Sequence, residues 1–294
     1  MSTSVRLSYQ VLGEMVVTNL TQTETGNRYL TYYQGTSTPG VYKFNSVTNA
    51  MTDNWFYLAD DSTASKHTFY IGKGGLNYSG NNGVYCIGLD KSDNEETIRP
   101  WNSDFTIANR GDNGKAVVFQ RKVVFCTDDA NNVGRTITID AVTRGYKGSS
   151  PAITVSGSGT LKVNKAAQND NNGVPSVTVK DTATLAFGAN GSLGTGAITL
   201  GNGTKLVLTA DSKDYTLVNK LSLPSGDNKV AMIRIDGKRL RSGDDQEIAT
   251  VASGTGVALD PNSTALAGRD GWLEVKNGKL CLTIKSGGTM IVIR

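Results

Sequence analysis

The chain has 294 residues, of which 38% are hydrophobic, and its formal net charge is only +4. This balance excludes a disordered low-complexity protein, because enough apolar side chains are present to form a core. Basic residues form no stripe interleaved with aromatic residues, so we expect no nucleic acid partner.

Glycine is abundant, with 34 residues, whereas proline is rare, with 6. Asparagine, threonine and serine fill the gaps between short apolar runs. Glycine and asparagine tolerate the positive φ of tight turns, so this composition is typical of many short strands joined by turns. The sequence therefore predicts an all-β fold.

Residues 1–66 are rich in aromatic side chains and show no regular period. We expect them to form an N-terminal β cap of irregular antiparallel strands that covers the end of a solenoid. Tyrosine and tryptophan rings can also stack on sugars, which makes the densest aromatic group a candidate carbohydrate contact. The alternative is that these rings plug the core. The group consists of Tyr29, Tyr32, Tyr33, Trp55 and Tyr57.

His67 is the only histidine of the chain. A Ser-His-Asp site would have to use it, and a zinc site would need further ligands that the sequence does not supply. We interpret it as an ordinary surface or turn histidine at the cap boundary. The three cysteines lie in apolar runs at unrelated spacings, so we expect buried, inert thiols, no metal site and no cofactor. They are Cys86, Cys126 and Cys281.

One set of charged residues has a plausible spacing for catalysis on acidic polysaccharides. A lyase of this kind uses acidic residues to hold calcium and a base to remove the proton alpha to a uronate. Adjacent residues of a strand face opposite sides, however, and Ala-Asn-Asn follows the acidic pair, so a turn is the alternative interpretation. The candidate residues are Asp128, Asp129, Asp140 and Arg144.

A tandem repeat of three copies, beginning at Pro151, Pro175 and Gly196, is the most informative feature. Each copy contains an apolar-Thr-apolar run, a small polar turn and a second alternating run. This period-two alternation predicts strands with one buried face, and two short strands per copy suit one coil of a solenoid. Like residues should then stack in parallel, about 4.8 Å apart. The predicted columns, whose members recur 24 and 21 residues apart, are Ile153, Val177 and Ile198, and Leu161, Leu185 and Leu206.

Weaker coils flank the repeat, so we predict a parallel β-helix over residues 67–250. The segment from Gly191 to Leu206 reads GSLGTGAITLGNGTKL. It resembles the passenger-associated repeat of bacterial autotransporters, which is built around Leu-Gly-x-Gly-x-Ile-Thr-Leu-x-Asn-Gly. Lys205 departs from that pattern. The resemblance implies a right-handed parallel β-helix on an exported bacterial protein, and it brings no catalytic residues with it.

Residues 251–294 differ from the repeat and are expected to close the solenoid as a C-terminal β-hairpin cap. Asn277-Gly278 stands between two alternating runs that extend from Trp272 to Ile284, which is a strong hairpin signal. We expect a second strand pair from Thr289 to Arg294.

No apolar run approaches the roughly 18 residues of a membrane-spanning helix, so we expect no membrane insertion by this chain. Its first ten residues lack the layout of a signal peptide. The protein either stays inside the cell or lost a leader before this sequence begins. We adopt the second interpretation, which predicts an extracellular or cell-surface location.

These observations favour a monomeric structural or adhesion module without catalysis, whose partner is a glycan or another host or cell-surface ligand. The first alternative is a carbohydrate-active β-helical enzyme, either a polysaccharide lyase or a glycoside hydrolase. The second is a trimeric fibre of the phage type, which would require chains wound together.

Overall fold

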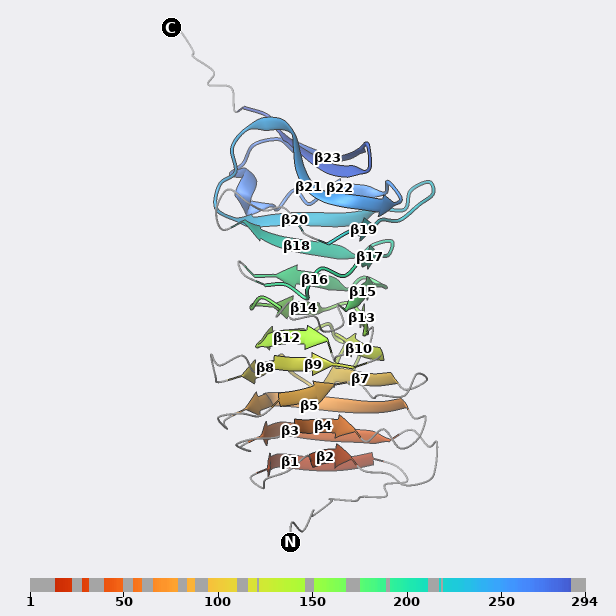
Figure 1. The fold of residues 1–294 in the computed structure, drawn as a ribbon, viewed down its shortest axis with the longest axis vertical. Coiled ribbons are helices and arrows are strands. Elements are labelled where there is room, and N and C mark those ends of the chain that lie inside the picture. Colours follow the sequence, from red (N-terminus) through yellow and green to blue (C-terminus); the bar gives the residue numbers. More distant parts are fainter. Residues whose placement is uncertain are drawn as a thin grey trace, which may run out of the picture.

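The computed structural model shows an elongated stack of β-strands that runs from β1 near one end to β23 near the other (Figure 1). Strands alternate with turns throughout the described residues, and the one helical element there is the short 3₁₀ helix η1 (Thr264–Leu266). The all-β prediction is confirmed. The structure describes residues 14–22, 28–31, 40–49, 55–59, 66–78, 84–87, 95–109, 116–120, 122–145, 151–167, 175–188, 191–210, 217 and 219–286.

The longest run of parallel pairing, which we call the first stack, extends along the whole solenoid. Each strand pairs in parallel with the next strand of the run, one coil later in the chain. The first stack consists of β1 (Glu14–Gln22), β3 (Val41–Asn49), β5 (Lys66–Tyr78), β7 (Glu95–Pro100), β10 (Lys122–Cys126), β13 (Ala152–Ser156), β15 (Ser176–Val179), β17 (Ile198–Leu200), β19 (Leu221–Ser222) and β21 (Gly243–Ser253).

A second stack lies across a corner from the first and is also parallel. It begins with the C-terminal parts of β1, β3 and β5, which pair with one another. It continues through β8 (Phe105–Asn109), β11 (Thr136–Asp140), β14 (Thr160–Val163), β16 (Thr184–Phe187), β18 (Lys205–Ala210), β20 (Ala231–Gly237) and β22 (Val257–Leu259).

A third stack is confined to the N-terminal half of the described residues. It ends at a single bridge between Thr143 and Ala167, so the coils change from three strands to two along the chain. The third stack consists of β2 (Arg28–Thr31), β4 (Trp55–Ala59), β6 (Val84–Ile87), β9 (Ala116–Phe119) and β12 (Val142–Gly145).

The predicted columns of like residues are confirmed. Val177 pairs in register with Ile153 and Ile198, and Leu185 pairs in register with Leu161 and Leu206. All six side chains are at most 1% exposed. A neighbouring buried column changes from aromatic to aliphatic residues toward the two-strand coils, because wider coils need larger side chains to fill them. In register order it contains Tyr42, Phe69, Ile98, Phe125, Val155, Val179 and Leu200.

The corners between the first two stacks are tied from coil to coil by polar side chains. Asp104 accepts a hydrogen bond from the N–H of Thr136, and Asn202 accepts one from the N–H of Val230, each over 2.8 Å. Backbone groups at a corner have no strand ladder to pair with and still need partners. Short Asp and Asn side chains supply them, which explains the polar residues between the apolar runs.

The expected N-terminal cap of antiparallel strands over residues 1–66 is wrong in the part that the structure describes. β1, β3 and β5 pair in parallel, as do β2 and β4, so the solenoid already includes these strands. The third strand lengthens each coil here: paired residues lie further apart in sequence (Thr68 and Thr97) than in the repeat (Thr178 and Thr199). The shorter period of the repeat is therefore absent from this region.

The C-terminal hairpin is confirmed. β23 (Gly271–Lys276) and β24 (Lys279–Ile284) pair antiparallel around Asn277 and Gly278, which have φ of 50° and 72° as a primed turn requires. β24 also pairs antiparallel with β21, and its Leu280 and Leu282 are fully buried. The hairpin thus covers the last coil. The strand pair expected from Thr289 to Arg294 lies outside the described residues.

Lys205, the departure from the repeat pattern, has a structural role. It lies at an outward position of β18, and its Nζ is 2.7 Å from Oδ2 of Asp260, whose side chain is 1% exposed. Asp260 directly follows β22, two coils further along. The ammonium group of Lys205 therefore compensates the negative charge of the buried Asp260 carboxylate.

None of the described helices is long and apolar enough to cross a lipid bilayer.

Candidate functional site

The four residues of the predicted lyase site are spread along one coil of the solenoid. Asp128 and Asp129 lie in the corner between β10 and β11, Asp140 ends β11, and Arg144 lies in β12. β11 is 5 residues long, which corresponds to about 16 Å of extended chain. The structure therefore does not bring the acidic pair together with Asp140 and Arg144.

Asp129 holds a turn, as the alternative interpretation predicted. Its Oδ1 accepts hydrogen bonds from the N–H groups of Asn131 (2.8 Å) and Val133 (3.1 Å), and its Oδ2 lies 2.9 Å from Nε of Arg135. Burial acts to raise the pKa of Asp129, but these hydrogen bonds and the Arg135 charge hold that pKa below its ordinary value. The carboxylate is ionised and fully engaged in the corner.

Asp128 and Arg99 tie neighbouring coils together. Oδ1 of Asp128 accepts hydrogen bonds from the backbone N–H (2.8 Å) and the hydroxyl (2.7 Å) of Ser158. Arg99 donates to the carbonyl oxygens of Asp128 and Asp129 at 3.1 and 2.9 Å. These side chains are components of the scaffold, and no group of three or more His, Cys, Asp or Glu in the described residues could hold a metal ion.

Asp129→Ala is expected to lower the free energy of unfolding by about 2–3 kcal/mol, because the two backbone N–H groups and Arg135 all lose their hydrogen bonds to the buried carboxylate. Asp129→Asn should cost about half as much, since the amide oxygen can still accept both hydrogen bonds. Chemical denaturation of both variants measures the difference. Equal losses for the two variants would contradict this account of the turn.

The predicted aromatic contact is only partly described. Tyr32 and Tyr33 lie outside the described residues. Trp55 and Tyr57 lie in β4, and their side chains are outside the described part as well. Tyr57 is in register with Tyr29 of β2 and with Cys86 of β6. A carbohydrate contact by this group stays a prediction.

His67 is not the surface or turn histidine that we expected. It lies inside β5 and is 5% exposed, and its Nδ1 accepts a hydrogen bond from the N–H of Gly40 at 3.2 Å. Its ring packs edge-on against Tyr42 and Phe69. Burial lowers its pKa to about 4, so the imidazole is neutral near pH 7. His67 belongs to the core.

The cysteine prediction is confirmed for one residue and wrong for another. Cys281 is a buried free thiol whose pKa is raised by burial. Cys126 is also free, but it is half-buried at an outward position of β10. The side chain of Cys86 lies outside the described part.

The outward face of the first stack carries a regular row of hydroxyl groups, which we call the threonine file. Its residues alternate with buried neighbours, which are apolar in the repeat but include His67 in β5 and Glu96 in β7. Thr178 and Thr199 are exposed. Val124 of β10 is the one interruption, between Thr97 and Thr154. In register order the file consists of Thr68, Thr97, Thr154, Thr178, Thr199 and Ser222.

Within the repeat, the file follows directly from the apolar-Thr-apolar pattern. Threonine is β-branched and favours strands, and the period of two turns its hydroxyl outward wherever both neighbours point inward. Parallel stacking then spaces the hydroxyls by about 4.8 Å. Each hydroxyl can donate one hydrogen bond and accept others, so the file offers an extended array of polar contacts to a polymer.

Neither a family model, nor a curated protein, nor a solved structure matches the chain.

Proposed function

We propose that the protein is a non-catalytic structural or adhesion module of an exported or cell-surface bacterial protein, and that it contacts a glycan chain through the threonine file. The threonine file is the observation that carries this proposal. It runs along the solenoid axis, which suits a linear polymer of hydroxyl-bearing units better than a compact small molecule.

The scaffold supports a role at an exposed location. Its strands are paired along the first stack from β1 to β21, and side chains tie the corners from one coil to the next. Such a stack offers proteases few extended unpaired segments. The resemblance of the Gly191–Leu206 segment to the autotransporter passenger repeat, together with a parallel β-solenoid, supports export from a bacterium.

The enzymatic alternative loses its specific support. Asp128 and Asp129 are engaged in a corner, whereas Asp140 is the last residue of β11 and Arg144 lies in β12. No other observation in the described residues favours cleavage of a polysaccharide, so we propose binding.

The double variant Thr178→Val/Thr199→Val tests the proposed contact. Valine keeps the β-branched shape but removes both hydroxyls, so binding to a polysaccharide ligand should weaken by roughly tenfold through the lost hydrogen bonds. Full-length protein would be screened by affinity electrophoresis against a panel of neutral and acidic polysaccharides, with product analysis for cleavage.

Thr184→Val is the matched control, because Thr184 lies at an outward position of the second stack, away from the file. Retention of full affinity by the double variant would overturn the proposed contact. Failure of the unaltered protein to bind any polymer of the panel would overturn the proposed function itself.

A further inference from the structure

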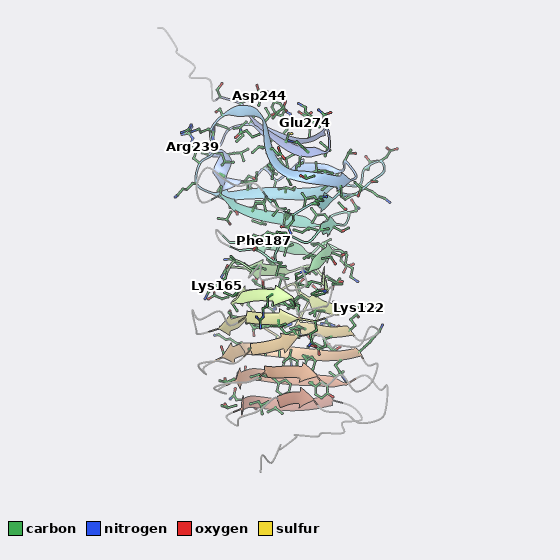
Figure 2. All side chains as sticks on the ribbon, in the orientation of Figure 1. Lys122, Lys165, Phe187, Arg239, Asp244 and Glu274 are labelled. Atoms are coloured by element: carbon green, nitrogen blue, oxygen red, sulfur yellow. The ribbon has the colours of Figure 1, made fainter. Side chains whose placement is uncertain are left out.

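Two rows of cations flank the threonine file. Each of these residues lies two positions before or after a residue in the register of the file; Lys180 directly follows β15 and Lys220 directly precedes β19. The period of two therefore places them on the outward face. Figure 2 shows Lys122 at the side of the solenoid opposite Lys165. The row before the file contains Lys66, Lys122 and Lys220, and the row after it contains Lys43, Arg99 and Lys180.

Acidic residues are scarce on the same face. Within strands β3 to β19 of the first stack the acids are Glu95 and Glu96, and Glu96 is fully buried. Glu95 lies in register between Lys66 and Lys122, and it therefore offsets one of the two charges. The nearby corner acids Asp128 and Asp181 already accept hydrogen bonds from corner groups. The face keeps an excess of positive charge.

The strands of the second stack carry fewer unpaired cations, of which Lys162 is one. On the second stack, the cations Lys205 and Arg234 have acidic partners at 2.7 and 2.8 Å. By contrast, the described residues provide no ion pair for the exposed lysines Lys66, Lys122, Lys180 and Lys220. Exposed cations without protein partners can pair with anions of a ligand.

The one aromatic residue in these rows is not available for stacking. The Tyr70 ring lies between Lys43 and Arg99 in register, and both cations lie over it, at 5.6 and 5.3 Å from its centroid. Binding of single-stranded nucleic acid depends on bare aromatic rings on which bases stack. The hydroxyl and ammonium groups of the face suit a polymer of sugars that carries carboxylates or sulfates.

We propose that the ligand of this face is an acidic polysaccharide that lies along the solenoid axis, with its hydroxyls on the threonine file and its acidic groups against the exposed lysines that flank it. This inference rests on the proposed function and names its substrate class. Lys66 and Lys122 are two strands apart, which corresponds to about 10 Å along the axis. Two acidic groups of one polymer at this spacing would meet both lysines.

The test compares polygalacturonate with its carboxyl-reduced form, which has the same backbone without the charge. The full chain should bind polygalacturonate at least tenfold more tightly than the reduced polymer, and its affinity should fall as salt is added. Lys122→Gln/Lys180→Gln should lower that affinity by about tenfold. Lys162→Gln, on an exposed position of the second stack, should leave it unchanged.

Equal binding of both polymers, with unchanged affinity of the double lysine variant, would overturn the acidic ligand while leaving the glycan contact in place. Binding of neither polymer, with neutral glycans of the panel bound instead, would overturn it in the same way. Tighter binding of a single-stranded DNA oligonucleotide than of polygalacturonate would also overturn it, in favour of a nucleic acid partner.

Discussion

Val177→Asp is expected to unfold the middle coils of the solenoid. Val177 is 1% exposed and lies in register between Ile153 and Ile198, so an aspartate there would place a carboxylate in an apolar column without a partner. The cost of burying an unpaired charge is several kcal/mol even when the group becomes protonated. Since each coil depends on its neighbours, the loss should spread to the adjacent coils.

Thermal unfolding and limited proteolysis measure this effect. The matched control is Thr178→Asp, which changes the next residue of β15 at an exposed outward position and should alter stability by no more than about 0.5 kcal/mol. The variant Val177→Asp should lose its cooperative transition or become sensitive to proteases in the repeat region. Similar behaviour of the two variants would show that Val177 does not point inward.

The repeat could be predicted because parallel stacking places like residues over one another. Ile153, Val177 and Ile198 are aliphatic for the same physical reason: each must fill the same position of a core that a single coil cannot close. The coils before the repeat obey the same rule, but a third strand and longer connections change their length. Pairs such as Lys43 with Tyr70 therefore share a register without sharing a residue type.

The sequence around His67 contains a pattern that indicates its burial. His67, Phe69 and Ile71 alternate along β5, and all three are buried. The period of two therefore places the histidine on the core face. Composition and motif arguments, which treat a lone histidine as a catalytic or surface residue, do not contain this information.

The threonine file and its flanking cations can be recognised only from the register of the strands. The sequence shows Thr178 and Thr199 in equivalent positions of the repeat, but Thr68 and Thr97 precede it at other spacings. The flanking cations, such as Lys66 and Lys122, are also far apart from one another in sequence. Only the pairing of successive strands shows that these residues share one face. The alternation along a strand determines whether a residue points inward or outward, but it does not determine which residue of the next coil lies beside it.

Lys205→Met is expected to lower the free energy of unfolding at neutral pH by about 2–3 kcal/mol. The change removes the cation that lies 2.7 Å from Oδ2 of Asp260, whose remaining partners are the backbone and side-chain amides of Asn262. Breaking a fully buried ion pair typically costs about 3–5 kcal/mol. The expected loss is smaller because the Lys205 side chain is 33% exposed and water screens part of the interaction.

The pH dependence of this loss identifies its cause. Burial acts to raise the pKa of Asp260, but Lys205 and Asn262 hold that pKa below its ordinary value. The group therefore stabilises the fold above the ordinary aspartate pKa, and this contribution disappears as the pH falls through the lowered value. In the methionine variant the pKa of Asp260 should rise, because burial is no longer opposed by a cation. The difference between the two proteins should thus be largest at neutral pH and should shrink in acid.

Urea unfolding of both proteins as a function of pH measures that difference. Lys162→Met serves as the control, because Lys162 is an exposed residue of the same stack and should change stability little at any pH. Lys205→Met/Asp260→Asn should recover part of the lost stability, since the uncharged amide removes the buried charge. A loss that is independent of pH, or that Asp260→Asn fails to reduce, would mean that Lys205 acts through packing of its aliphatic stem.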